Sequence, residues 1–300
     1  MKTFPTLVVA ALLTGCVING EKHIRPRDLD ASTLVNRTRI LGIRALPAEI
    51  RPGERAAFEA LIGTAEGEAP ELGSVWIACP EGDDFGCATD LGDLNLDNAT
   101  PEDLAAIGFI GFEPGLPPAY AAPNDLLDDI SAADRLEGRS VLVQLSLFPL
   151  ELLEEGVEEI DFNAVEGAYK RLVVSEATTP NDNPGLSAFL VDRFAVVPGI
   201  SAVHVEPKQS YDLGILLQDV SGREVYEFVN SSGELEERVE EPYASWYATS
   251  GEVLEPVTLW PFMESTWRAP AEAGTKGTWY VVIRDRRGGM SWWTQDFVVD

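Results

Sequence analysis

Cysteine and histidine carry much of the covalent, metal and acid–base chemistry of proteins, and this chain of 300 residues has three cysteines and two histidines. Cys16 ends the stretch "LLTGC", and Cys79 and Cys87 enclose "CPEGDDFGC". His23 lies in a polar stretch and His204 in an expected strand. The chain has no His-Glu-x-x-His zinc pattern, no Gly-x-Ser-x-Gly nucleophile turn and no Gly-rich phosphate loop. We therefore predict no catalytic residue and no cofactor.

Cys16 follows an apolar run from Phe4 to Leu13 that is preceded by Lys2. A run of about ten residues is too short to span a bilayer, which needs about 20, but it suits a secretion signal over residues 1–15. "LTGC", ending at Cys16, resembles a bacterial lipobox. That resemblance implies lipidation of the Cys16 sulfur, cleavage before Cys16 and acylation of the new amine. Two or more acyl chains would hold the protein stably on a membrane.

The residue after Cys16 is Val17 and not Asp. Among bacterial lipoproteins, Asp at this position retains the protein at the inner membrane, so the resemblance implies an outer-membrane location. In such an oxidising compartment we expect Cys79 and Cys87 to form a disulfide. Free thiols and a metal pair are the alternatives, although two cysteines make a poor zinc set.

The formal net charge of −28 comes from 50 carboxylates against 22 Lys and Arg. A nucleic-acid backbone must be met by cations, so this balance excludes nucleic acid as a partner. The chain is nevertheless 45% hydrophobic, with 7 Trp and 12 Phe, and can build cores. The charge is interpreted as the solvated surface of an envelope protein.

Short alternating segments separated by turn residues predict an all-β fold with two immunoglobulin-like β-sandwich domains in tandem. The first domain carries short helical insertions, the clearest of which begins at Thr100. "TTPNDNPGL", starting at Thr178, is a strong break. The predicted organisation is a signal peptide (1–15), a lipidated tether (16–38), a first β-sandwich domain (39–178), a linker (179–195) and a second domain (196–300).

The end of the chain resembles bacterial immunoglobulin-like and PKD-type domains. The residues that carry this resemblance are Trp246, Trp267 to Pro270, Gly277, Asp285, Gly288 and Gly289. It implies a sandwich fold and no particular function, because such folds host many. The whole layout is similar to uncharacterised envelope lipoproteins of myxobacteria.

Metal-ligand patterns are weak. Asp93, Asn95 and Asp97 place oxygen side chains at alternate positions, as at the start of an EF-hand loop, but Leu104 stands where the bidentate Glu should be. "NDN", Asn181 to Asn183, is interpreted as turn residues at a domain joint. No metal is therefore predicted, and a calcium-dependent adhesion module is kept as an alternative.

Adjacent residues on a strand face opposite sides, so neighbouring aromatic residues cannot share one core. If Trp246 and Trp279 face inward, then Tyr247, Tyr280 and one of Trp292 or Trp293 face outward. We therefore predict an exposed aromatic binding patch made of Tyr247, Tyr280, Trp292 and Trp293, unless the first domain or the charged stretch near residues 224–242 covers it.

These observations together indicate a non-enzymatic binding or scaffolding protein of the bacterial cell envelope. It is expected to meet the membrane through its N-terminal lipid and to bind a protein or glycan partner mainly through the second domain. A calcium-dependent adhesion module is the first alternative. An envelope hydrolase built on paired carboxylates is the weaker one, since some of 50 acidic residues will always lie close together.

Overall fold

The structure is a computed structural model that describes residues 33–67, 70–80, 100–106, 108–111, 116–150, 165–196, 202–218, 223–230, 232 and 234–300. The signal peptide, Cys16, Cys87 and the candidate ligands Asp93, Asn95 and Asp97 lie outside these residues. In the described part of the chain, no helix is both long and apolar enough to cross a membrane.

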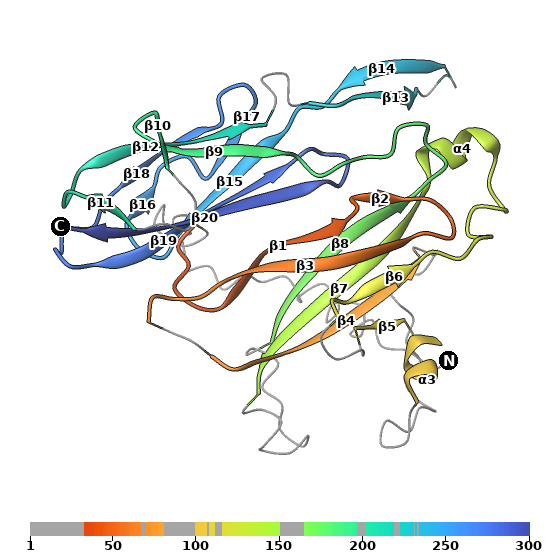
Figure 1. Ribbon diagram of the computed structural model, residues 1–300, viewed down its shortest axis with the longest axis horizontal. Coiled ribbons are helices and arrows are strands. Elements are labelled where there is room, and N and C mark those ends of the chain that lie inside the picture. The colour runs from red at the N-terminus through yellow and green to blue at the C-terminus, as the bar shows by residue number, and fades with distance from the viewer. Residues whose placement is uncertain are drawn as a thin grey trace, which may run out of the picture.

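The first half of the chain forms two facing sheets (Figure 1). Its described strands are β1 (Arg39–Leu46), β2 (Glu49–Ile50), β3 (Arg55–Gly63), β4 (Leu72–Pro80), β5 (Phe109–Ile110), β6 (Ala119–Ala121), β7 (Arg139–Pro149) and β8 (Glu166–Val174). The sheet orders are β1-β3-β6 and β2-β8-β7-β4-β5. Two short helices, α3 (Pro101–Ala106) and α4 (Ala132–Glu137), lie between strands.

The second half forms another pair of sheets and a separate hairpin. Its described strands are β9 (Leu186–Val191), β10 (Phe194–Val196), β11 (Val203–Val205), β12 (Ser210–Leu217), β13 (Val225–Val229), β14 (Leu235–Val239), β15 (Tyr243–Ala248), β16 (Glu252–Val253), β17 (Val257–Leu259), β18 (Glu264–Arg268), β19 (Lys276–Arg284) and β20 (Met290–Val299). The sheet orders are β10-β9-β12-β18-β16 and β11-β20-β19-β15-β17, and β13 pairs with β14.

The two halves share one strand order. In the second half, β9-β12-β18-β16 follows the A-B-E-D order of an immunoglobulin sandwich, and β15, β19 and β20 take the C, F and G places. The first half repeats this with β1-β3-β6 as A-B-E and β4, β7 and β8 as C, F and G. In each half a two- or three-residue strand, β2 or β11, runs parallel to the last strand. The prediction of an all-β fold with two immunoglobulin-like sandwiches is confirmed.

The cores differ in composition. The second core is aromatic, with Trp246, Trp267 and Trp279 almost fully buried beside Phe189 and Phe297. The first core is mainly aliphatic. Its rings are Phe58 and the half-buried Trp76 and Tyr120, and Phe58 and Trp76 stack with centroids 6.2 Å apart. Trp76 and Trp246 both lie on the strand that takes the C place, as expected for this fold.

Two predicted segments need correction. The predicted linker 179–195 contains β9 and β10, and β9 lies inside the second sandwich between β10 and β12. The predicted tether 16–38 ends earlier, because Val35 N donates to Ala248 O at 2.8 Å and Ala248 N donates to Thr33 O at 3.0 Å. These bonds attach the start of the described chain to β15.

The helix starts follow local capping chemistry. Thr100 caps α3 as predicted, since its hydroxyl accepts the Asp103 N–H at 3.2 Å. Ser131 caps α4 and accepts the Asp134 N–H, while Asn124 lies in the preceding turn.

Candidate functional site: the junction between the two sandwiches

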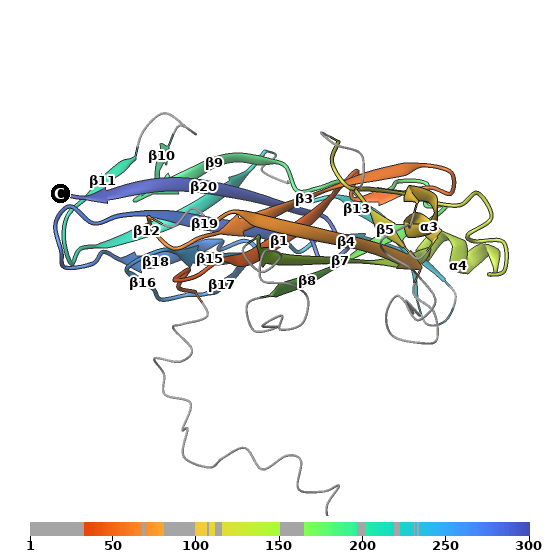
Figure 2. The same cartoon turned by 90° about the horizontal axis from the view of Figure 1, so that it is seen from below.

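The predicted aromatic patch lies at the junction between the two sandwiches. Its residues belong to β15, β19 and β20 of the second sandwich, which Figures 1 and 2 show next to the first half. The facing was predicted correctly, since both tyrosines and one of the two tryptophans were expected to face outward. Tyr247, Tyr280 and Trp292 lie on the face of β15, β19 and β20 opposite the tryptophan core, whereas Trp293 packs against that core. The patch is not exposed: the first half covers it, which is the exception stated with the prediction, and leaves Tyr280 only 8% exposed.

We call this region the apolar contact. It consists of Val35, Leu41, Leu61, Tyr280, Val282 and Met290, with Tyr247 and Trp292 packed against it. A β-bulge in β1 between Ile40 and Gly42 changes which face the strand presents. A Cβ on Gly42 would lie 2.7 Å from Met290 Sδ, so glycine permits the close approach of β1 to β20.

Two arginines border the apolar contact. The Arg44 guanidinium lies 4.3 Å from the Trp292 ring centroid and 2.6 Å from a Glu59 carboxylate oxygen. Arg284 donates to Leu41 O at 3.1 Å and to Ser245 Oγ at 3.1 Å, which links the two halves directly. Arg44 therefore covers an edge of the aromatic face with its charge paired, whereas Arg284 is held by two neutral acceptors, one from each half.

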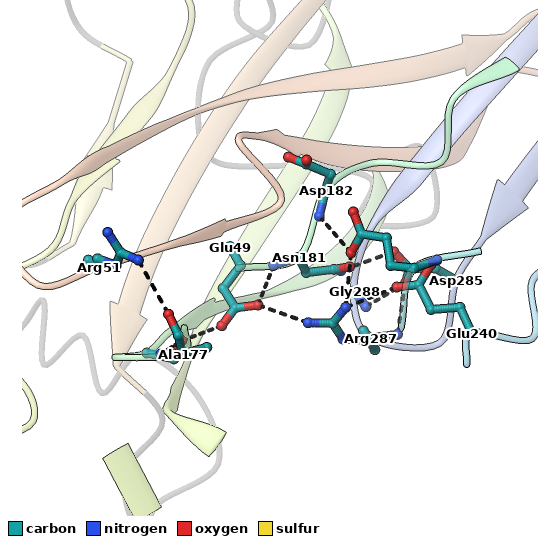
Figure 3. Close-up of polar contacts among 11 residues, drawn as sticks. Glu49, Arg51, Ala177, Asn181, Asp182, Glu240, Asp285, Arg287 and Gly288 are labelled. Atoms are coloured by element: carbon teal, nitrogen blue, oxygen red, sulfur yellow. Dashed lines mark hydrogen bonds and ion pairs between the residues drawn. The ribbon is translucent and has the colours of Figure 1, made fainter. Parts of the chain in front are cut away.

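A second region, the polar contact, is built around the turn from Asp285 to Gly289 that joins β19 to β20 (Figure 3). Asp285 is 1% exposed and its Oδ1 accepts the N–H groups of Arg287 at 2.7 Å and Gly288 at 2.9 Å. Gly288 has φ of +119°, which few residues other than glycine adopt. Asn181 Nδ2 donates to Asp285 Oδ2 at 3.0 Å. The tight turn thus projects towards the first sandwich.

Lys170 of β8 meets this turn from the other side. It points the same way as Ala168 and Leu172, into the edge of the first core, and is only 6% exposed. Its Nζ donates to the carbonyl oxygen of Gly288. Burial lowers the pKa of Lys170 to about 8, although the Asp285 charge opposes that shift.

Glu49 of β2 ties the connecting segment to the first sandwich. It accepts the Ser175 hydroxyl, and its Oε2 accepts the Asn181 N–H at 2.7 Å. The same oxygen lies 3.6 Å from an Arg287 guanidinium nitrogen (Figure 3). The chain between the sandwiches is therefore fixed by a buried carboxylate from the first half and an arginine from the second.

Asn183 adds a direct bridge. Its Nδ2 donates to Ala45 O at 2.8 Å and its Oδ1 accepts the Met290 N–H at 2.8 Å. The interpretation of "NDN" as joint residues agrees with this placement, since both amides, Asn181 and Asn183, make side-chain bonds across the junction.

Arg287 lies close to three carboxylates. Besides Glu49 it lies 3.0 Å from a Glu224 oxygen and 3.1 Å from a Glu240 oxygen, and its guanidinium is 4.3 Å from the Tyr226 ring centroid. Burial, with the neighbouring Asp285 charge, raises the pKa of Glu240 to about 7. Burial also raises the pKa of Glu224. Acids thus outnumber bases here, and Glu240 titrates near neutral pH.

A cleft of about 300 Å³ opens beside the polar contact. One wall is the hairpin of β13 and β14, which extends from the second sandwich towards α4 (Figure 1). The other wall comes from α4, β8 and the connecting segment. The lining residues are Glu49, Leu136, Glu137, Val173, Ala177, Thr178, Thr179, Tyr226, Glu227, Phe228, Leu235, Arg286 and Arg287.

The structure brings only part of the predicted site together. Cys79 lies near the end of β4, and because Cys87 is outside the described residues the disulfide stays a prediction. Cys16 and the weak metal candidates are likewise outside them. Across the described ranges, no group of three His, Cys, Asp or Glu side chains is placed to hold a metal ion.

Sequence reasoning missed Lys170 and Glu49. A signal for Lys170 was present: strict alternation in "AYKRLVV" puts the lysine on the same face as the apolar Ala168 and Leu172. Glu49 offered no such signal, because its role depends on Asn181 and Arg287, which are distant in sequence.

Comparison with known proteins does not assign the chain to a family. No family model matches it, and no curated protein does either. Among solved structures, the three N-terminal domains of the Highly Immunogenic Outer Capsid protein of bacteriophage RB49 match with 9% identity and a TM-score of 0.23, over 87% of this chain and 59% of that one. Murine CEACAM1b matches with 11% identity and a TM-score of 0.23, over 88% and 99%.

The Escherichia coli adhesin FdeC matches with 10% identity and a TM-score of 0.17, over 89% of this chain and 65% of that one. The chain therefore spans about 59% of the phage fragment and 65% of the adhesin structure. At TM-scores this low the likeness carries no weight, and the fold assignment rests on the strand order described above.

Proposed function

We propose that this chain is a lipid-anchored protein of the bacterial cell envelope that acts as a non-catalytic binding or scaffolding module for a protein or glycan partner. One observation carries the proposal. Among the described residues, the groups with large pKa shifts are Lys170, which bonds across the junction to Gly288, and Glu240, which pairs with Arg287 in the same polar contact.

Strongly shifted pKa values often mark catalytic groups, so their partners need inspection. A general acid or base must reach a proton on a substrate. Lys170 instead donates to the Gly288 carbonyl, and Glu240 is held by Arg287 and accepts the Glu224 N–H at 3.2 Å. The shifted pKa values of Lys170 and Glu240 therefore have a structural explanation. The junction serves to hold the two sandwiches in one orientation for binding.

The attachment of Thr33 and Val35 to β15 supports an anchoring role for the segment before them. If Cys16 carries lipid, about 17 residue steps separate it from Thr33, which at full extension span no more than about 60 Å. The second sandwich would then be held within that distance of the membrane.

Anchoring is tested by the mass of the mature N-terminus in the full-length protein. We expect a mass increase equal to two or three acyl chains on a chain that begins at Cys16. In Cys16→Ala we expect no acylation and release from the membrane fraction. Cys79→Ala is the matched control and should keep both the acyl mass and the membrane association. A wild-type chain with an unmodified Cys16 would refute the anchor.

The binding role is tested separately, by cross-linking in intact envelopes with a photoreactive residue at exposed positions such as Leu235 of the hairpin or Phe262. We expect a defined cross-linked protein or glycan species at one position and not at the other. Turnover of a substrate at a rate lowered by Glu240→Gln or Lys170→Met would contradict the non-catalytic assignment.

A further inference from the structure

We propose that the cleft between the β13–β14 hairpin and α4 binds an extended, basic segment of a partner protein, which adds as a strand to the open edge of β13. This inference rests on the proposed binding function and names the class of partner and the surface that receives it. It follows from three properties of the cleft: a free strand edge, negative charge without a matching cation, and apolar walls.

The edge of β13 that faces away from β14 is free. Main-chain bonds flank the ladder, with Glu240 N donating to Glu224 O at 3.0 Å and Asn230 N donating to Glu234 O at 2.8 Å. Alternate residues of an antiparallel strand turn their main-chain groups to opposite sides. Those of Val225 and Glu227 therefore point out of the hairpin, and within the described chain they have no main-chain partner there.

This free edge faces the cleft. Tyr226, Glu227 and Phe228 of β13 all line it, and α4 lies beside β13 on that side (Figure 1). A strand edge with open N–H and C=O groups is a template for another strand, and peptide recognition by strand addition uses it. The bound segment must then be extended.

The charge of the cleft selects a basic segment. Its own cations already have partners: Arg287 is paired with carboxylates of the polar contact, and Arg286 lies 3.7 Å from Glu241. Glu137 and Glu227, both exposed, form no ion pair with any described cation. The whole chain carries a net charge of −28. An incoming Lys or Arg gains attraction, whereas an acidic segment is repelled.

The walls of the cleft determine which side chains suit the bound segment. Side chains along an extended strand point alternately to either side. Leu136, Val173 and Leu235 offer apolar surface in the same cleft that holds these two carboxylates, neither of which is paired with a described cation, although Glu227 accepts the Thr178 hydroxyl at 3.3 Å. A segment that alternates basic and apolar residues satisfies both, so we take alternating Lys and Val as its simplest form.

The test is the fluorescence anisotropy of labelled peptides with the full-length protein at about 0.15 M salt, where exposed charges are screened beyond about 8 Å. The probe is a peptide of alternating Lys and Val. A peptide of alternating Lys and Pro keeps the charge but lacks every second N–H, and one of alternating Glu and Val reverses the charge. We expect the Lys–Val peptide to bind at least about tenfold more tightly than either.

Variants locate the binding. Glu137→Lys and Glu227→Lys should each weaken Lys–Val binding about tenfold. Val225→Pro removes an outward N–H while leaving the ladder to β14 intact, and should also weaken it about tenfold. Glu272→Lys is the matched control and should leave binding unchanged. Glu272 is exposed and precedes the first residue of β19, at the end of that strand away from the cleft.

Equal affinity for the Lys–Val and Lys–Pro peptides would overturn the proposal, because it would mean attraction by charge alone. Equal losses in Glu272→Lys and Glu137→Lys would do the same. So would no binding of the Lys–Val peptide at about 1 mM. In any of these cases the proposed function survives if Cys16 is acylated and a partner cross-links elsewhere.

Discussion

The apolar contact and the polar contact join the same two sandwiches by different means. The apolar contact buries Leu41, Val282 and Met290 and depends on shape and area. The polar contact buries Lys170, Glu49 and Asp285, and each of these groups depends on a particular partner. Apolar packing tolerates change of one residue at a cost set by its size. A buried charged network tolerates such a change poorly, because removal of one member leaves its partners buried and unpaired.

The two contacts also differ in how they fix the relative position of the sandwiches. Apolar packing is non-directional, so the apolar contact alone would allow sliding of one sheet over the other. Hydrogen bonds are directional, and Asn183 and Arg284 fix β1 against β20 and β19 at set positions. The geometry of the cleft beside the polar contact depends on this second kind of bond.

The largest expected effect is that of Asp285→Ala. The change leaves the N–H groups of Arg287 and Gly288 and the Asn181 amide without their acceptor, and Lys170 without its counter-charge. We expect a loss of about 3–5 kcal/mol in the free energy of unfolding, measured by urea denaturation.

The matched control for this change is Asp296→Ala on the neighbouring strand. Asp296 is exposed, and within the described chain its carboxylate accepts only the Thr278 hydroxyl, at 2.8 Å. A surface change of this kind should cost within about 0.5 kcal/mol. If both variants lost the same stability, the polar contact would not have the role described for it.

Leu41→Ala tests the apolar contact. Leu41 is 4% exposed and packs with Tyr280 and Val282 across the junction. Truncation should cost about 2–4 kcal/mol, and the cost should not change with pH. Leu216→Ala, at a leucine that is 49% exposed on β12, is the control and should cost less than about 0.5 kcal/mol. A cost that varied with pH would show that the two contacts are coupled.

How much of this could be read from the sequence differs between the contacts. Strand alternation correctly predicted that Trp246 and Trp279 face one way and Tyr247 and Tyr280 the other. It could not predict that Tyr280 is covered, because its neighbour Leu41 is far away in the sequence. Facing is a local property of a strand, and exposure is not.

The linker and the polar contact show the same limit. The turn residues from Thr178 to Gly185 marked the joint correctly, but the predicted linker continued through β9, which lacks clean alternation. Nothing local marks Glu49 as the partner of Arg287. The glycines of "RRGG" are a local turn signal, and Gly288 adopts a positive φ in that turn.

The pH dependence of stability separates the contacts further, through Lys170. Its folded pKa of about 8 is below the value of 10.5 for a free lysine, so the unfolded chain binds more protons between these pH values. Stability should therefore rise from about pH 8 towards pH 10.5, by up to about 3 kcal/mol. Denaturation midpoints across this range, in wild type and Lys170→Met, measure the rise.

In Lys170→Met the rise should disappear, because no titrating group remains at that position. Lys276→Met is the control, since Lys276 is exposed at the start of β19, and should keep the rise. Glu240 does not interfere, because its pKa of about 7 confines its effect to lower pH, where stability falls as pH rises from about 4.5 to 7. A rise that persisted in Lys170→Met would assign it to another group.

The smallest expected effect is at the edge of the apolar contact, where Arg44 lies 4.3 Å from the Trp292 ring and pairs with Glu59. Arg44→Ala should cost about 0.5–1.5 kcal/mol, because both partners are partly exposed. Double-mutant cycles with Trp292→Leu and with Glu59→Gln divide this cost between ring and carboxylate. High salt should weaken the coupling to Glu59 and leave the coupling to Trp292 nearly unchanged, since screening acts mainly on the exposed ion pair. If salt removed both couplings equally, the stacking of Arg44 on Trp292 would contribute no stability of its own. This edge of the apolar contact would then be stabilised by charge, as the polar contact is.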